Sequence, residues 1–115
     1  MPAFQELPLI TRTFDLAREM TQRARKFPRD LKFVLSDRML TTTYDILDLV
    51  VEAKYARSKR ALLDRANILL ERLRFQVRLC VDEKLMTVKQ YEYVAGIIQE
   101  VGARSEEHTS ELQSQ

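Results

Sequence analysis

The chain has 115 residues, of which 45% are hydrophobic and 31% are charged, with one cysteine. This length suits a single domain, and the composition is that of a globular protein rather than a disordered chain. No apolar run approaches the ~20 residues of a membrane span, no secretory signal pattern opens the chain, and one cysteine cannot form an internal disulfide. We therefore expect a cytoplasmic protein without membrane contact. Two glycines and three prolines favour long helices over a β fold with many turns.

The basic side chains are unevenly distributed. Residues 1–104 contain all 19 Lys and Arg but only 14 of the 17 acidic residues, so this part carries a net charge near +5. Arginine outnumbers lysine by 13 to 6. Because guanidinium groups bind phosphate through paired hydrogen bonds, this excess favours a polyanionic partner such as RNA or DNA. An ordinary basic, soluble surface is the alternative.

Two helices are expected in the first half of the chain. The first runs from about Leu9 to Lys26 and ends before Pro28, which disfavours helical backbone at the preceding residue. The second begins at Asp30, a suitable N-cap, and reaches about Ala56. The apolar positions of the first helix are Ile10, Phe14 and Ala17, with Leu9, Leu16 and Met20 beside them. Those of the second are Phe33, Leu40, Tyr44, Leu47 and Val51, with Leu35, Met39, Ile46, Val50 and Ala53 alongside.

Two more helices are expected in the second half. Ser58 can cap a third helix from about Lys59 to Glu83. Thr87 and Gln90 form a T-x-x-Q capping box at the start of the fourth, which ends near Gly102. Short connections make sequential helices antiparallel neighbours. The sequence therefore predicts an all-α domain over residues 1–103, an antiparallel up-down-up-down four-helix bundle.

The third helix is apolar over more of its circumference than one core needs. Ile68, Phe75 and Leu79 lie off its main stripe, and a second apolar face requires a second burial surface. We predict that these three residues form an oligomer interface; an unusually wide core face is the alternative. The main stripe consists of Leu62, Leu63, Ala66, Leu69, Leu70, Leu73, Val77 and Cys80.

Patterns that carry catalysis are lacking. The chain has one histidine, His108, and shows neither a glycine-rich phosphate loop nor metal-ligand spacing. Cys80 lies on the apolar stripe and is expected to be a core residue. Asp45, Asp48 and Glu52 lack the Glu-x-x-His motifs that a di-iron bundle uses. We expect no enzyme activity, no catalytic residue, no metal, no cofactor and no small-molecule substrate.

Basic residues recur at helical spacing and form the candidate nucleic-acid-binding set. Arg18, Gln22, Arg25 and Arg29 follow i, i+4, i+7, i+11, and Arg74 precedes Arg78 by four residues. Solvated faces with ordinary salt bridges are the alternative, since Asp64 can pair with Arg60 and Glu71 with Arg74. The full set is Arg18, Arg25, Lys26, Arg29, Arg57, Lys59, Arg60, Arg65, Arg72, Arg74 and Arg78.

Several short segments together resemble the small bacterial four-helix-bundle proteins over residues 9–103. The segments are Lys26-Phe27-Pro28-Arg29 with Phe33-Val34-Leu35, Leu49-Val50-Val51-Glu52-Ala53-Lys54-Tyr55, residues 66–79, and Leu85 with Lys89-Gln90-Tyr91-Glu92-Tyr93. One branch of this group, encoded by intervening sequences in 23S ribosomal RNA genes, usually carries S-I-P-x-N-I-A-E-G at the second helix. The corresponding residues 44–53 contain neither Pro nor Gly.

The chain more closely resembles the other branch, the accessory variability determinant of diversity-generating retroelements. That resemblance implies a homopentameric barrel of four-helix bundles with a basic surface. It further implies a protein without catalytic activity that binds the retroelement's reverse transcriptase and its template RNA or an RNA/DNA hybrid, and so supports mutagenic cDNA synthesis. The alternatives are an intervening-sequence-type bundle protein of undefined role and a structural protein-interaction module.

The last residues depart from this group. Residues 104–114 read RSEEHTSELQS, which matches one translated frame of a widely used sequencing adapter residue for residue. We therefore expect residues 104–115 to be a non-native, disordered tail; a genuine polar tail is the alternative.

Overall fold

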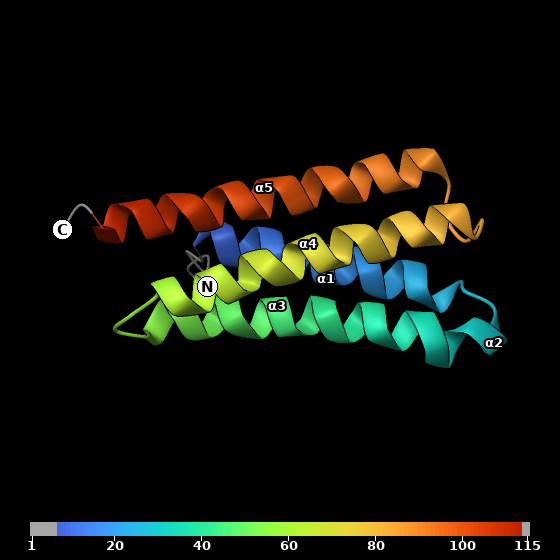
Figure 1. Ribbon diagram of the computed structural model, residues 1–115, viewed down its shortest axis with the longest axis horizontal. Coiled ribbons are helices and arrows are strands. Elements are labelled where there is room, and N and C mark those ends of the chain that lie inside the picture. Colours follow the sequence, from blue (N-terminus) through green and yellow to red (C-terminus); the bar gives the residue numbers. More distant parts are fainter. Residues whose placement is uncertain (1–6, 114–115) are drawn as a thin grey trace, which may run out of the picture.

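The computed structural model of the chain is a bundle of four long helices (Figure 1). It describes the backbone of residues 7–113 and the side chains of residues 7–31 and 33–107. The elements are α1 (Pro8–Arg25), the short α2 (Arg29–Leu31), the π-helical turn η1 (Lys32–Ser36), α3 (Asp37–Tyr55), α4 (Arg60–Asp82) and α5 (Val88–Gln113).

The four long helices occupy the corners of the bundle. α1 packs against α3 and α5, and α4 packs against the same two helices. Successive helices run in opposite directions because short turns join them (Figure 1). Within the described residues all regular structure is helical, which confirms the predicted all-α, antiparallel four-helix bundle.

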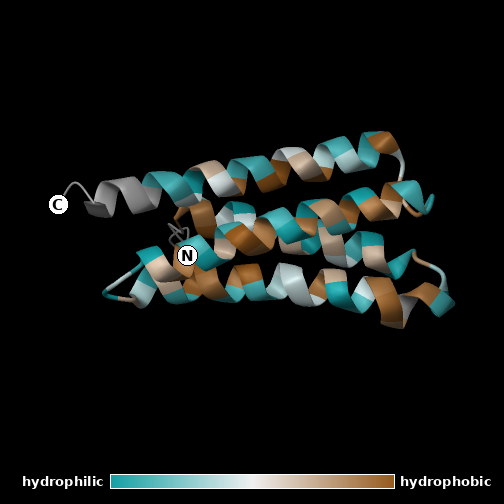
Figure 2. Cartoon of the chain, viewed as in Figure 1, coloured by the Kyte–Doolittle hydropathy of each residue, from teal (hydrophilic) through white to brown (hydrophobic). Residues whose placement is uncertain are grey.

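The core draws large apolar side chains from every long helix. Hydrophobic and hydrophilic residues alternate along each helix, as expected where one side is buried and the other faces water (Figure 2). Burying one such side chain stabilises the fold by about 1.5–3 kcal/mol. The fully buried members include Leu16 and Met20 of α1, Met39 and Ile46 of α3, Leu63 and Leu73 of α4, and Val94 and Ile97 of α5.

The second expected helix is interrupted. Asp30 lies inside α2 instead of capping a long helix, and η1 separates α2 from α3. A π-helical turn has wider spacing than an α-helix, so it shifts which residues face inward. Phe33 and Val34 are exposed in η1, whereas Ser36 is buried.

The buried face of α3 also differs from the predicted stripe. Tyr44 and Val51 are exposed, and Leu40 and Leu47 are only partly buried. The core face instead consists of four residues that were predicted to lie alongside that stripe, together with two threonines that were not predicted. The buried residues of α3 are Met39, Thr42, Thr43, Ile46, Val50 and Ala53.

Two predicted caps have different outcomes. The capping box is confirmed: the Thr87 N–H donates to Gln90 Oε1 (3.0 Å), and the Gln90 N–H donates to Thr87 Oγ1 (3.1 Å). The Ser58 cap is wrong, because Lys59 occupies the position before α4 and no side chain caps that helix.

The end of α5 differs from the sequence prediction. The helix continues through Gly102 to Gln113, so neither an end at Gly102 nor disorder over residues 104–113 describes the structure. A single glycine within a helix costs only about 1 kcal/mol relative to alanine. Residues 103–107 contain no glycine or proline that would end the helix. Val101 and Ser105, which are one turn apart, are both buried. That residues 104–115 derive from an adapter stays a prediction.

Candidate nucleic-acid and protein interfaces

The off-stripe residues of the third predicted helix form an exposed apolar row on α4. Ile68 is 57% exposed, Phe75 60% and Leu79 46%, which confirms that they lie outside the bundle core. We call these three residues the α4 apolar row. Arg72 lies in the same row, one turn after Ile68. Ile68, Arg72 and Phe75, with Arg38 of α3, line a shallow hollow of about 500 Å³. The sequence pattern gave no indication that Arg38 borders this surface.

The basic residues of the helix connections lie at opposite ends of the bundle. Lys26 lies in the turn after α1 and Arg29 begins α2, whereas Arg57 lies in the turn between α3 and α4 and Arg60 begins α4 (Figure 1). The helical spacing that joined Arg29 to α1 in the sequence does not hold, because α1 ends at Arg25. The length of the bundle therefore separates these two groups.

Lys59 has a structural role in the turn between α3 and α4. Its ammonium group donates to the backbone carbonyl oxygens of Ala53 (2.8 Å) and Lys54 (3.0 Å). A cation at a helix C-terminus satisfies carbonyl groups and complements the helix dipole. Lys59 is therefore less available to a phosphate than the sequence suggested.

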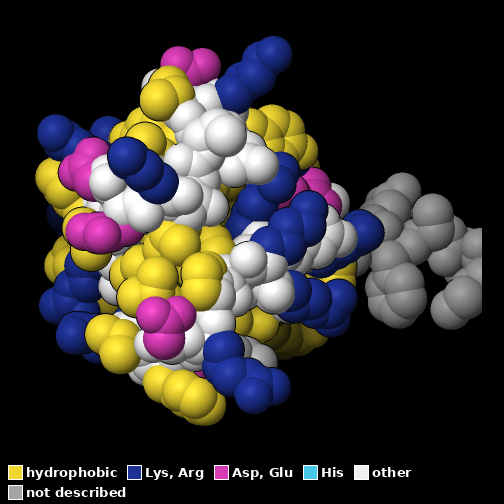
Figure 3. All heavy atoms as spheres, turned by 90° about the vertical axis from the view of Figure 1, so that its right-hand side faces the viewer, with side chains coloured by type: hydrophobic (Ala, Val, Ile, Leu, Met, Phe, Trp, Pro, Cys, Tyr) yellow, Lys and Arg dark blue, Asp and Glu magenta, His cyan; other side chains and the backbone are white. Residues whose placement is uncertain are grey.

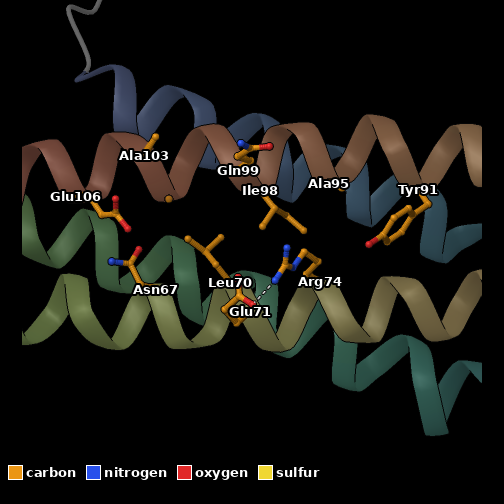
Figure 4. A pocket seen from close by; sticks show the side chains of 11 residues that line it. Asn67, Leu70, Glu71, Arg74, Tyr91, Ala95, Ile98, Gln99, Ala103 and Glu106 are labelled. Carbon is orange, nitrogen blue, oxygen red and sulfur yellow. Dashed lines mark hydrogen bonds and ion pairs between the residues drawn. The ribbon is translucent and has the colours of Figure 1, made fainter.

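The five predicted arginines that lie on α4 are exposed, but they differ in their partners. Arg74 is paired with Glu71 (2.5 Å) at the edge of a groove of about 460 Å³ between α4 and α5 (Figure 4). Arg60 pairs more loosely with Asp64 (3.9 Å), so both pairings expected from the sequence are present. No ion pair to a described acidic side chain is found for Arg65, Arg72 and Arg78.

Ion pairing on α1 leaves two of its arginines uncompensated. Arg12 bonds to Asp15 (3.2 Å) and to Glu100 of α5 (2.5 Å), and Arg23 bonds to Glu19 (2.7 Å). The bond from Arg12 is the main reason that the pKa of Glu100 lies below its usual range. Both acidic residues of α1 are thereby occupied. Arg18 and Arg25 are exposed and have no ion pair with any described residue.

These two arginines border a groove of about 370 Å³ between α1 and α3. Phe14 of α1 and Tyr44 of α3 lie on opposite sides of it, 51% and 41% exposed. The prediction that Phe14 is a core residue is therefore wrong. Sequence reasoning also missed Phe14 and Tyr44 as surface residues, because both fit apolar helical stripes.

Basic side chains crowd one flank of the bundle when it is viewed end-on (Figure 3). On the opposite flank they alternate with acidic and hydrophobic side chains (Figure 3). A surface potential that is concentrated on one side attracts a polyanion more strongly than the same charges spread evenly.

The described side chains offer little for catalysis. Within residues 7–31 and 33–107, no three His, Cys, Asp or Glu side chains gather where they could hold a metal ion. Burial raises the pKa of the Cys80 thiol to about 11, which disfavours the reactive thiolate. His108 lies outside the described side chains. None of the helices in the described range combines the length and apolar character needed to cross a bilayer.

Comparison with known proteins identifies a family and solved structures of similar fold. The family model described as bAvd-like matches residues 9–106. A protein of unknown function from the S23 ribosomal protein family of Bacteroides thetaiotaomicron has a similar structure, with a TM-score of 0.78 and 18% sequence identity. The alignment covers 84% of this chain and 94% of that one, and at this identity the likeness concerns the fold alone. No curated protein matches the chain in sequence.

Proposed function

Because the chain belongs to the bAvd-like family, the bacterial accessory variability determinants, we propose that it is an accessory protein of a diversity-generating retroelement. In this role it binds the reverse transcriptase and the template RNA, and it supports mutagenic cDNA synthesis without catalysing it. The observation that carries the proposal is the family match, which spans residues 9–106 and so nearly the whole bundle.

The α4 apolar row supports a role in protein assembly. A monomer that leaves Ile68, Phe75 and Leu79 exposed along about three turns of one helix has an apolar face available to a protein partner. We assign this face to self-association, and the homopentamer implied by the family is the assembly that we propose. Arg72 and Arg38, at the same hollow, supply polar groups for the rim of such an interface.

The uncompensated arginines support a role in RNA binding. Arg18, Arg25, Arg65, Arg72 and Arg78 have no ion pair with any described residue, so their charge is not cancelled locally. A phosphate backbone can bind such groups without first breaking an existing pair. Arg74 is a weaker candidate because Glu71 already holds it.

Equilibrium binding of fluorescently labelled template RNA, measured between 50 and 200 mM salt, tests the RNA part of this proposal. Each phosphate contact releases counterions, so the affinity should fall steeply as the salt concentration rises. Replacing Arg18 and Arg25 together by Gln, or Arg74 and Arg78 together by Gln, should weaken binding and reduce the salt slope by about one for each lost contact. We expect the larger effect from the first pair.

A charge-matched control separates specific contacts from net charge. Lys84→Gln with Lys89→Gln also removes two positive charges, from exposed positions in or near the turn between α4 and α5. This control variant should retain more of the salt slope of RNA binding than either arginine double variant does. An equal reduction of the salt slope in all three variants would show that the two arginine pairs do not belong to the binding surface. No RNA binding at 50 mM salt would contradict the proposal itself.

A further inference from the structure

The groove between α1 and α3 places two aromatic rings where water can reach them. Phe14 and Tyr44 are about half exposed, whereas Leu, Ile, Val and Met side chains fill the core beside them. Exposed rings at a groove give flat apolar faces on which a planar group can stack. Leu47, which is partly buried, and Ala17, which is buried, complete the apolar lining.

Hydrogen bonds hold the Tyr44 ring across this groove. The Thr21 hydroxyl donates to the backbone carbonyl of Ala17 (2.7 Å), and the Tyr44 hydroxyl lies 2.8 Å from Thr21 Oγ1. Because the only hydroxyl proton of Thr21 is used by Ala17, Tyr44 donates to Thr21. The Tyr44 ring is thus fixed before any ligand arrives, so this side chain loses less conformational entropy when a ligand stacks on it.

The cations of the groove lie on one wall. Arg18, Gln22 and Arg25 follow each other on α1 at i, i+4 and i+7. Arg18 and Arg25 are about 10.5 Å apart along the helix axis, from seven residues at 1.5 Å each. Three stacked nucleotides extend about the same distance at 3.4 Å per nucleotide. The exposed acids of α3, Asp45 and Asp48, make the α3 side the less favourable one for phosphates.

From this arrangement we propose that the α1–α3 groove binds single-stranded nucleic acid. Unpaired bases stack on Phe14 and Tyr44, and the phosphates follow Arg18 and Arg25 along α1. Positive charge beside exposed aromatic rings is the combination that recognises unpaired strands, because paired bases in a duplex hide their faces. The inference rests on the proposed function and narrows its RNA partner to an unpaired stretch.

The test compares ligands that carry the same phosphates with and without bases. Fluorescein-labelled 12-nucleotide oligo(U), an abasic oligonucleotide of equal length and a 12-base-pair RNA duplex are titrated with the full chain at fixed salt. We expect oligo(U) to bind at least about tenfold more tightly than the abasic strand. Phe14→Ala and Tyr44→Ala should each weaken oligo(U) binding about tenfold and leave abasic and duplex binding unchanged. Arg18→Gln with Arg25→Gln should weaken the binding of both single strands.

Tyr55→Ala is the matched control for ring loss. Tyr55 is an exposed tyrosine on the same helix, three turns from Tyr44 and outside the groove, so this variant should bind like the unchanged chain. Tyr44→Phe keeps the ring and should keep most of the base preference. If an alanine variant loses its helical circular dichroism signal, Phe14→Leu and Tyr44→Leu remove the ring while retaining apolar volume.

The possible results separate this inference from the function on which it rests. A base preference that disappears with either ring supports the groove. Equal binding of oligo(U) and the abasic strand, or a base preference that survives both ring substitutions, overturns the groove and leaves RNA binding intact. No binding of any nucleic acid overturns the groove and the RNA part of the proposed function together.

Discussion

Glu100 is the residue whose ion pairs connect the last helix to the first. Its carboxylate accepts hydrogen bonds from Arg12 of α1 (2.5 Å) and from Arg104 one turn later on α5 (3.2 Å). These bonds, led by that from Arg12, hold the pKa of Glu100 below its ordinary value. The unfolded chain therefore binds this proton at a higher pH than the folded chain does. The resulting stability is present above the ordinary carboxyl pKa and is lost as the pH falls through the lowered folded value.

Urea unfolding at pH 7 and at about pH 3 tests this linkage. The Glu100→Gln variant should have a lower unfolding midpoint than the unchanged chain at pH 7, and the two midpoints should converge at acid pH. Glu92→Gln, which alters an exposed acid of the same helix without an ion pair to any described residue, should lower the unfolding midpoint at pH 7 less than Glu100→Gln does. A Glu100→Gln deficit of the same size at both pH values would contradict the assignment.

Threonine explains why part of the core could not be predicted from the sequence. Thr13, Thr42 and Thr43 are buried, and each hydroxyl donates to the backbone carbonyl four residues earlier, at 2.7, 2.9 and 2.8 Å. A hydroxyl satisfied in this way can be buried at little cost. Threonine does not contribute to apolar periodicity, so the apolar pattern of the sequence indicates the neighbouring stripe with Tyr44 on α3 and includes Phe14 on α1.

At the scale of the helices, Lys84 occupies a backbone conformation that suits glycine better. It follows the C-terminus of α4 with φ of 60°, in the left-handed region. The Leu85 N–H donates to the Cys80 carbonyl (2.8 Å) and the Lys84 N–H to that of Val81 (3.0 Å), which is the Schellman pattern of helix termination. Lys84→Gly should therefore raise the free energy of unfolding by about 0.5–1 kcal/mol, because glycine has no Cβ to strain there.

Chemical denaturation of the two forms measures this gain. Lys89→Gly is the matched control: Lys89 lies inside the first turn of α5, where the same change should lower stability. If Lys84→Gly is as destabilising as Lys89→Gly, the strain assigned to Lys84 is absent.

Helix boundaries were predictable where a local chemical signal is strong. Pro28 and the Thr87–Gln90 capping box each act within a few residues, and both predicted boundaries are close to the observed ones. The η1 turn has no comparable local signal, because its residues, 32–36, contain neither proline nor glycine. The continuation of α5 past Gly102 depends on packing against other helices, which a single glycine does not reveal.

At the scale of the whole molecule, the sequence predicted one candidate surface better than the other. The α4 apolar row was apparent because Ile68, Phe75 and Leu79 lie outside the apolar stripe that one core face of α4 can bury. The α1–α3 groove was not apparent, because its rings and arginines come from two helices and its rings fit core stripes. The register between α1 and α3 depends on tertiary packing, and only that packing brings Tyr44 beside Thr21.

The α4 apolar row should control self-association. We expect the full chain to sediment as an oligomer at micromolar concentration, and Phe75→Asp to shift it toward the monomer by placing a charge in a desolvated interface. Val88→Asp, an equally exposed apolar position at the start of α5, should leave the sedimentation unchanged. A chain that sediments strictly as a monomer, or a Phe75→Asp variant that remains fully assembled, would contradict the proposed interface.

The accessory role in cDNA synthesis is tested most directly by reconstitution. The reverse transcriptase and template RNA of the proposed retroelement are incubated with and without the chain, and the cDNA made from the template is quantified and sequenced. We predict that mutagenic cDNA appears only when the chain is present, and that the chain alone makes none. The same yield of mutagenic cDNA without the chain would contradict the account.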